Sequence, residues 1–213
     1  MRLLLIRETE PRPPALEVAV AHALLEHAGA PVLRAPGGHA VAYHAGCLGI
    51  DEVVPAEDPI AGLQDRFAAM GEVLAGALRS LGVDARMGRV PREFCPGEYT
   101  VNARGRVKLV GTAQRVVRRG SLLAGSLAVT GGDALRAVLA DVYAALDLDW
   151  DPSTAAAVED EGVAAGLDAV EGAVLAAYAE RHELVPATLD PAILAAAAEL
   201  REWHTIAPAR SAI

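Results

Sequence analysis

Lys108 is the first residue of this chain that could do chemistry, because it is the only lysine beside eighteen arginines. It lies in the stretch GRVKLVGTAQR, residues 105–115. An ammonium is a compact point charge that a planar guanidinium does not replace. A lysine kept alone can therefore have a chemical role. The alternative is that a composition rich in Ala, Arg and Gly left one lysine by drift, and the spacing does not separate the two.

Two cysteines, Cys47 and Cys95, are the other reactive candidates. Two cysteines do not make a disulfide framework of the secreted kind, so both are expected to be free thiols in the cytosol. A cysteine among basic residues can ionise to a nucleophilic thiolate, and Cys95 lies in such a segment. An isolated cysteine is more often a buried core residue. Cys47 lies in an apolar run and is expected in the core.

The charge of the chain, -9 in total, is unevenly distributed. Residues 85–119 hold nine basic and two acidic side chains, whereas from residue 120 onward fifteen acids outnumber four arginines. A basic segment in an acidic protein attracts phosphates or acidic protein partners, unless it is only a solvated strand face. Nucleic acid is not an expected partner, because the segment has few aromatic residues and the net charge repels a polyanion.

The length of 213 residues fits one compact domain with its own core. No apolar run approaches the roughly 18 residues of a membrane span. The N-terminus, MRLLLIRETEPRPP, has too few apolar residues for a signal peptide. The sequence therefore predicts a cytoplasmic protein without a membrane partner.

The elements that must position these residues begin with a helix at 14–27. Residues 32–50 then predict a strand, a Pro-Gly-Gly loop and a second strand. The pair Asp58-Pro59 predicts the start of an amphipathic helix that continues to Gly82. Residues 98–129 predict a β-meander with strands at 99–102, 106–117 and 122–129. In a regular middle strand, Lys108, Thr112 and Gln114 share one face.

The pattern becomes helical after Gly131-Gly132. Asp133 is the expected N-cap of a helix at 134–146, and further helices are expected at 154–181 and, behind Asp190-Pro191, at 191–203. The predicted fold class is α/β (α+β), a mixed β-sheet flanked by helices. Residues 1–132 form its core, and residues 133–213 form a small acidic helical part packed on the same domain.

Three segments carry a resemblance to a known family: RAPGGHAV at 34–41, CPGEY at 95–99 and GRVKLVGTAQR at 105–115. They resemble the R-x-x-G-G-x-A-V loop, the cysteine segment and the G-x-K-x-x-G-x-A-Q-x-R element of the biotin/lipoate protein ligase superfamily. The match is best to its lipoate-protein ligase and octanoyltransferase branch. The third segment is long and contiguous and is the most specific of the three.

The resemblance implies an α/β catalytic domain whose sheet cradles a medium-chain acyl group. The implied reaction attaches octanoate or lipoate to a lysine of a lipoyl-domain acceptor. Cys95 would accept the acyl group as a thioester. Lys108 would contact the acyl carbonyl, where its ammonium can stabilise the developing oxyanion. The implied donor is an acyl carrier protein or free lipoate, and this transferase needs neither a cofactor nor a metal.

The resemblance also implies a set of substrate-binding residues. Two of them, Gly37 and Gly38, let the backbone approach the substrate closely, although a plain hairpin turn explains two glycines equally well. The full set is Arg34, Gly37, Gly38, His39, Ala40, Tyr99, Gly111, Thr112 and Gln114.

Two other functions stay open at this point. An ATP-dependent lipoate or biotin ligase, with ATP and Mg as cofactors, would hold an acyl-adenylate with the Gly-Gly loop and arginines, and Cys95 would be incidental. A catalytically silent relative would bind an acyl carrier, a lipoyl domain or a fatty acid. Ala124, which stands where the family has a histidine, and the short part before Arg34 favour that last reading.

Overall fold

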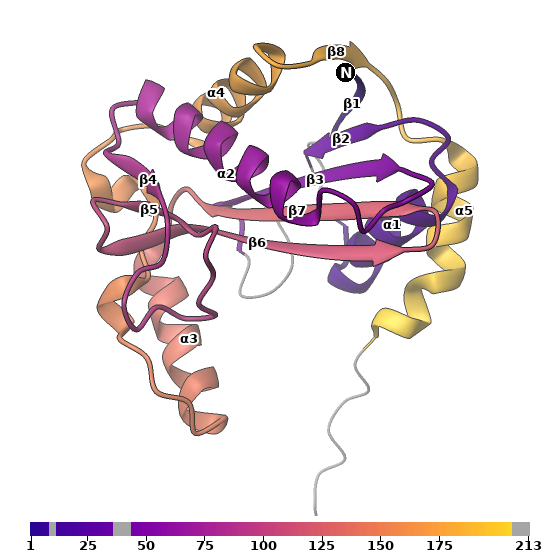
Figure 1. Ribbon diagram of the computed structural model, residues 1–213. Coiled ribbons are helices and arrows are strands. Elements are labelled where there is room, and N and C mark those ends of the chain that lie inside the picture. The colour runs from indigo at the N-terminus through magenta and orange to yellow at the C-terminus, as the bar shows by residue number, and fades with distance from the viewer. Residues whose placement is uncertain (9–11, 36–43, 206–213) are drawn as a thin grey trace, which may run out of the picture.

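The computed structural model describes residues 1–8, 12–35 and 44–205. Its central feature is an eight-stranded sheet with the strand order β4-β5-β6-β7-β3-β2-β1-β8 (Figure 1). The strands are β1 (Arg2–Arg7), β2 (Val32–Ala35), β3 (Cys47–Pro55), β4 (Ala85–Met87), β5 (Val101–Ala103), β6 (Val107–Val117), β7 (Gly120–Ala128) and β8 (Glu183–Pro186).

The sheet is mixed, because β1 runs parallel to both of its neighbours, β2 and β8, whereas the other pairs are antiparallel. Strands β6 and β7 form the long hairpin of the expected meander. The predicted class, a mixed sheet flanked by helices, is therefore confirmed.

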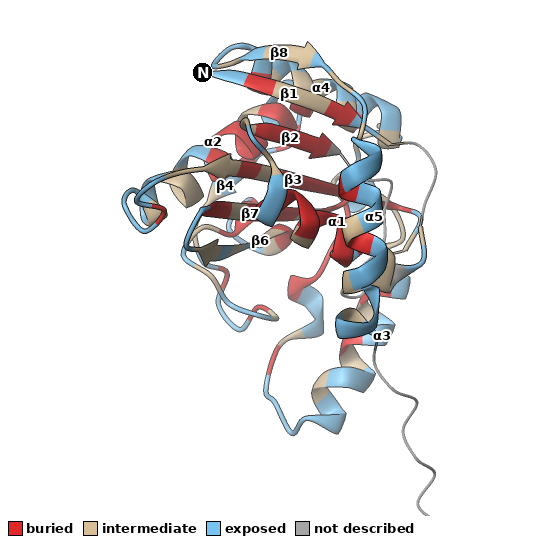
Figure 2. Cartoon of the chain, turned by 90° about the vertical axis from the view of Figure 1, so that its right-hand side faces the viewer, coloured by how far each residue is buried: buried red, intermediate tan, exposed pale blue. Residues whose placement is uncertain are grey.

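Helices cover both faces of the sheet. On one face lie α2 (Leu63–Ser80) and α4 (Leu167–Ala179), and on the other lie α1 (Pro14–His27) and α5 (Pro191–Leu200) (Figures 1 and 2). Helix α3 (Gly132–Ala145) projects from one end of the sheet. Short 3-10 turns occupy Pro152–Thr154, Val158–Glu161 and Arg201–His204. No helix among the described residues is long and apolar enough to cross a membrane.

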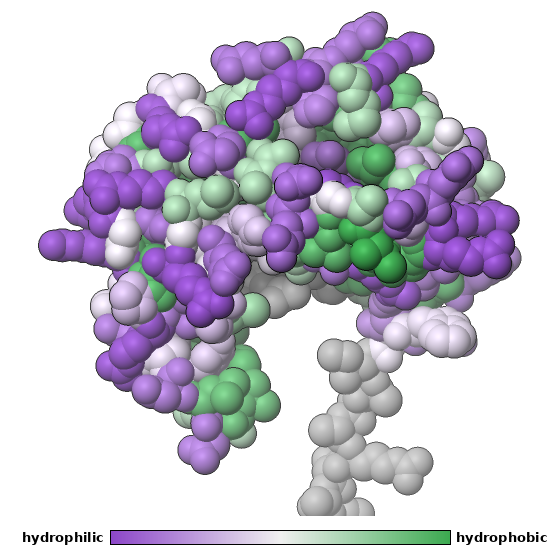
Figure 3. Space-filling model, viewed as in Figure 1, coloured by the Kyte–Doolittle hydropathy of each residue, from purple (hydrophilic) through white to green (hydrophobic). Residues whose placement is uncertain are grey.

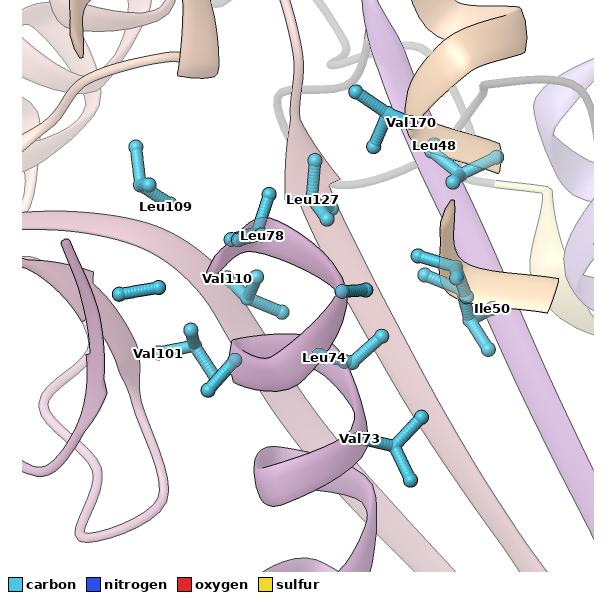
Figure 4. Packing of buried hydrophobic residues seen from close by; sticks show 14 of the residues in the cluster. Leu48, Ile50, Val73, Leu74, Leu78, Val101, Leu109, Val110, Leu127 and Val170 are labelled. Atoms are coloured by element: carbon cyan, nitrogen blue, oxygen red, sulfur yellow. The ribbon is translucent and has the colours of Figure 1, made fainter. Parts of the chain in front are cut away.

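Three apolar clusters hold the layers together. The largest lies between the sheet and the α2–α4 layer and includes Ile50, Leu74, Leu78 and Leu127 (Figure 4). The second joins α1 and α5 to the opposite face. The third packs α3 against the ends of β3 and β7, and it contains Cys47, Ala128, Leu135, Leu139 and Trp150.

The predicted helix at 154–181 is wrong in its first half. Ala155 to Ala157 are buried, and the chain there is extended between two 3-10 turns. Ala155 forms a parallel bridge with Lys108, and the Ala156 N–H donates to the Lys108 carbonyl over 3.4 Å. The alanine-rich stretch favours a helix locally, but the edge of β6 offers its backbone tertiary partners, and α4 begins only at Leu167.

Candidate functional site

Lys108 lies at a β-bulge. Asn102 pairs with Lys108 and Val101 pairs with Val110, so Leu109 has no partner on β5. One extra residue reverses the alternation of side chains beyond it. Lys108 therefore shares its face with Gly111, where an added β-carbon would lie 3.3 Å from Lys108 Cε.

The expectation that Lys108, Thr112 and Gln114 share a face is therefore wrong. Gln114 lies beside Leu63 and Arg66 of α2, and Thr112 pairs with Gly125, a position that faces the α2 side chains. The bulge leaves no signature in the amino-acid types, so only the structure reveals the change of face.

The ammonium of Lys108 is buried and surrounded by the segment that carries Cys95. Only 4% of Lys108 is exposed. Its Nζ donates to the carbonyl oxygens of Phe94 at 3.1 Å and Cys95 at 2.7 Å. It also lies 3.4 Å from Glu93 Oε2 and 4.7 Å from the centre of the Phe94 ring. The two reactive residues picked from the sequence are thus brought together.

Cys95 is exposed and sits in a constrained loop between β4 and β5. Its φ of +42° is in the left-handed region, which costs energy for a residue other than glycine. Its N–H donates to the Tyr143 hydroxyl of α3 at 2.6 Å. The preceding Arg92, with φ +58°, accepts at its carbonyl from the Asp151 N–H at 2.9 Å. The loop is therefore held from both sides in a conformation that presents Cys95 to solvent.

Cys47 is a core residue, as expected. It is buried in the cluster under α3. Burial raises the pKa of its thiol, against the opposing effect of its backbone contact with His44. Cys95 is thus the accessible thiol among the described residues.

A strip of small residues crosses the same face of the sheet as Lys108. Gly49, Ser126 and Gly111 lie opposite one another on β3, β7 and β6, and Ala124 pairs with Ala113 in the next row. Along β3 the strip lies between Cys47, which belongs to the third cluster, and Val53, which belongs to the second. Figure 3 shows the molecule notched between its α3 part and its α1–α5 part. The strip thus consists of residues with small side chains or none, and the Lys108 side chain lies over Gly111.

Arg34 stands at the other end of this face. It is completely buried and donates to Glu8 at 2.5 Å, to Asp51 at 3.1 Å and to Glu17 of α1. Burial raises the pKa of Asp51, partly offset by Arg34. For Glu8, burial acts in the same direction, but Arg12 and Arg34 outweigh it and lower its pKa. Arg34 thus anchors the end of β2 through carboxylates of the protein itself.

The remaining predicted residues lie elsewhere or outside the described part. Tyr99 stacks on Phe67 of α2, with ring centres 5.3 Å apart, so it belongs to the opposite face together with Thr112 and Gln114. Gly37, Gly38, His39 and Ala40 lie outside the described residues. The structure therefore gathers Cys95, Lys108 and Gly111, and it separates Tyr99, Thr112 and Gln114 from them.

Glu93 is a member of the site that the sequence did not single out. Its side chain is fully buried, and it lies beneath the Cys95 loop. The one available signal was an acidic residue two positions before the cysteine in a basic segment. The described residues contain no group of three or more side chains arranged to hold a metal ion.

Comparison with known proteins identifies the family. The model of the lipoyl protein ligase A/B catalytic domain matches residues 13–160, which is more than half of the chain. The chain therefore belongs to this family.

One curated relative is similar to this chain in sequence, and two solved structures are similar to it in fold. An octanoyl-GcvH:protein N-octanoyltransferase of Geobacillus kaustophilus is 33% identical over 108 residues, which cover 51% of this chain and 38% of the relative. The chain thus matches well under half of that relative's length. A lipoate protein ligase of Thermoplasma acidophilum, part of a bipartite enzyme described with its E2 lipoyl domain, aligns with a TM-score of 0.72 at 20% identity. The alignment covers 95% of this chain and 92% of the ligase chain. A lipoate-protein ligase A bound with ATP aligns with a TM-score of 0.74 at 20% identity, with 95% of both chains covered. These structures show the same fold.

Proposed function

We propose that this protein transfers an octanoyl or lipoyl group to a lysine of a carrier domain through a thioester on Cys95. The observation that carries the proposal is the hydrogen bond from Lys108 Nζ to the carbonyl of Cys95, 2.7 Å long. It places the buried ammonium against the backbone of the exposed cysteine, and the family resemblance implies these two residues for acyl transfer.

The reaction has two acyl transfers. Cys95 loses its proton, and its thiolate attacks the carbonyl carbon of a thioester donor. A new carbon–sulfur bond forms, the donor's own carbon–sulfur bond breaks, and the donor's sulfur leaves and takes up that proton. The neutral amine of the acceptor lysine then attacks the thioester, a carbon–nitrogen bond forms, the carbon–sulfur bond to Cys95 breaks, and the leaving thiolate takes up the proton released by the amine. In each step the carbonyl oxygen becomes negative, and an ammonium beside it lowers the barrier. Lys108 supplies that charge by exchanging one of its carbonyl partners for the substrate oxygen.

The small-residue strip supports a place for the acyl chain. It lies on the face of Lys108, and its residues have small side chains or none. A hydrocarbon chain gains about 0.8 kcal/mol of transfer free energy for each CH₂ group that it buries. We therefore propose the strip as the place of the medium-chain acyl group that the family resemblance implies.

We also propose candidates for the acyl donor and for the acceptor. The curated relative is named for octanoyl-GcvH as donor, so this donor joins acyl carrier protein and free lipoate as candidates. Arg89 and Arg92 flank the Cys95 loop, and each pairs with an exposed carboxylate of the protein, Glu98 and Asp149 respectively. The excess of basic over acidic residues in 85–119, nine against two, favours an acidic carrier domain.

A transfer assay tests the proposal. Octanoyl-GcvH, octanoyl-acyl carrier protein, and free lipoate with ATP and Mg are each offered together with a lipoyl domain, using the native chain, Cys95→Ser and Cys47→Ser. The proposal expects acylated lipoyl domain from a thioester donor, loss of transfer in Cys95→Ser, and normal transfer in Cys47→Ser. Transfer only from lipoate with ATP, unchanged in Cys95→Ser, would establish an ATP-dependent ligase. No transfer from any donor would favour a silent relative.

A further inference from the structure

Glu93 lies at the centre of the loop that carries Cys95. Its Oε1 accepts from the Val90 N–H at 3.2 Å and the Gly97 N–H at 3.4 Å. Its Oε2 accepts from the Thr100 hydroxyl at 2.9 Å and lies 3.4 Å from Lys108 Nζ. One buried carboxylate thus ties both ends of the loop to the only lysine of the chain.

The contact with Glu93 gives the third proton of the Lys108 ammonium a partner. An ammonium has three protons to donate and no lone pair. Two of its protons go to the carbonyls of Phe94 and Cys95, and Glu93 lies beside the third. A charge pair at 0% and 4% side-chain exposure is costly unless both members are satisfied, and here they are.

We propose that Glu93 is a positioning residue that fixes Lys108, as an ammonium, on the Cys95 loop. It has two effects. It places the positive charge where the acyl carbonyl arrives, and it keeps the protein's own lysine from capturing the acyl group. The second effect rests on the proposed thioester function, whereas the first does not.

The side reaction that Glu93 prevents is a transfer from sulfur to nitrogen. A neutral Lys108 amine would attack the Cys95 thioester, a carbon–nitrogen bond would form, and the carbon–sulfur bond would break. The leaving thiolate would take up the proton released by the amine. The product would be a stable amide on Lys108 and an enzyme without its ammonium. An ammonium with all its protons engaged cannot begin this reaction.

The test uses the fact that the chain has one lysine. With ¹⁵N-lysine labelling, the only side-chain ammonium signal is that of Lys108. A buried, hydrogen-bonded ammonium exchanges its protons with water slowly and gives an observable signal, so the native protein is expected to show one. Glu93→Gln keeps the size of the side chain and removes its charge, and the signal is expected to broaden or disappear.

Glu161→Gln is the matched control, because the Glu161 side chain is likewise little exposed, at 6%, and pairs with Arg104 at 2.8 Å outside the loop. It is expected to keep the signal. Thr100→Val removes one bond that orients Glu93 and keeps both charges, so it covers the case in which Glu93→Gln fails to fold. Thr100→Val is expected to broaden the ammonium signal less than Glu93→Gln does. An unchanged ammonium signal in folded Glu93→Gln, or in Thr100→Val if Glu93→Gln does not fold, overturns the proposal.

Intact-mass measurement with an octanoyl thioester donor gives the second readout. Glu93→Gln is expected to form the Cys95 adduct at least about tenfold more slowly at saturating donor, with the half-saturating donor concentration little changed. Part of its adduct is expected to resist hydroxylamine and to map to Lys108. If even the native chain forms no adduct, the proposed function fails while the NMR result still decides the role of Glu93. An adduct that forms at the native rate and stays fully hydroxylamine-labile in Glu93→Gln contradicts the proposal.

Discussion

Among single residues, Arg34 shows how a motif residue can serve the fold around a site. Its guanidinium is fully buried and is shared by Glu8, Glu17 and Asp51. Breaking a buried ion pair from one side leaves uncompensated charge, which is far more costly than losing an exposed pair. The network therefore fixes the end of β2, from which the chain continues into the Gly-Gly segment.

Arg34→Met is expected to lower the free energy of unfolding by about 3–5 kcal/mol, because the buried Glu17 and Asp51 and the half-buried Glu8 lose their shared cation. Chemical denaturation measures the change. Arg7→Met is the control, since Arg7 pairs with Glu171 but is 54% exposed. Arg7→Met should lower the free energy of unfolding by no more than about 1 kcal/mol. Equal losses in the two variants would show that the Arg34 network is not a structural anchor.

The sequence identified Lys108 and Cys95 by residue type and motif, and the structure brings them together. It could not assign Thr112 and Gln114 to a face, because one unpaired residue at Leu109 reverses the alternation. It also gave no reason to prefer Glu93 over other acids, because burial and hydrogen bonding by Val90, Gly97 and Thr100 arise only in the folded loop.

At the scale of elements, Tyr178 connects α4 to the sheet. It is buried, and its hydroxyl donates to Glu52 of β3 at 3.2 Å. Burial, together with the neighbouring Glu52 carboxylate, raises the pKa of Tyr178 well above its ordinary value. The folded chain thus keeps the phenol proton at a pH where the unfolded chain loses it.

Stability should therefore fall as the pH rises above about 10, where an unfolded tyrosine ionises and the folded Tyr178 does not. Tyr178→Phe removes this contribution, so its unfolding free energy should decline less between about pH 8 and pH 11 than that of the native chain. At neutral pH the variant should be less stable by roughly 1–3 kcal/mol, because Glu52 loses its donor. Denaturant titrations at both pH values measure the difference. Parallel pH slopes in the two proteins would contradict this account of the contact.

The longer elements followed from local pattern. The helix at 14–27 and the hairpin of β6 and β7 have apolar periodicity or clear turn signals, and both are present. The parallel strands β1 and β8 were not predicted, since their runs of four to six residues gain their partners only from distant parts of the chain. The helix expected from 154 fails for the same reason, because Lys108 supplies its backbone partner.

On the scale of the whole molecule, the last third of the chain is part of the packing around the sheet. Strand β8 pairs with β1, and α5 packs on α1 in the second cluster. Val170, Val174 and Tyr178 of α4 belong to the largest apolar cluster. Each layer thus takes side chains from both sides of Gly132.

Residues 1–132 expressed alone should therefore fail to fold cooperatively, because both faces of the sheet would lose apolar cover. Circular dichroism and thermal unfolding of fragments 1–132 and 133–213, separately and mixed, measure this. Recovery of a cooperative transition on mixing would support two parts packed on one domain. A cooperative transition in fragment 1–132 alone would show that the core is independent of the helical part.

The most direct test of the central claim is the intact mass of the protein after incubation with an octanoyl thioester donor. One octanoyl adduct is expected on the native chain and on Cys47→Ser, removed by hydroxylamine, and none is expected on Cys95→Ser. An adduct of the same size and lability on Cys95→Ser, or none on the native chain with any thioester donor, would contradict it.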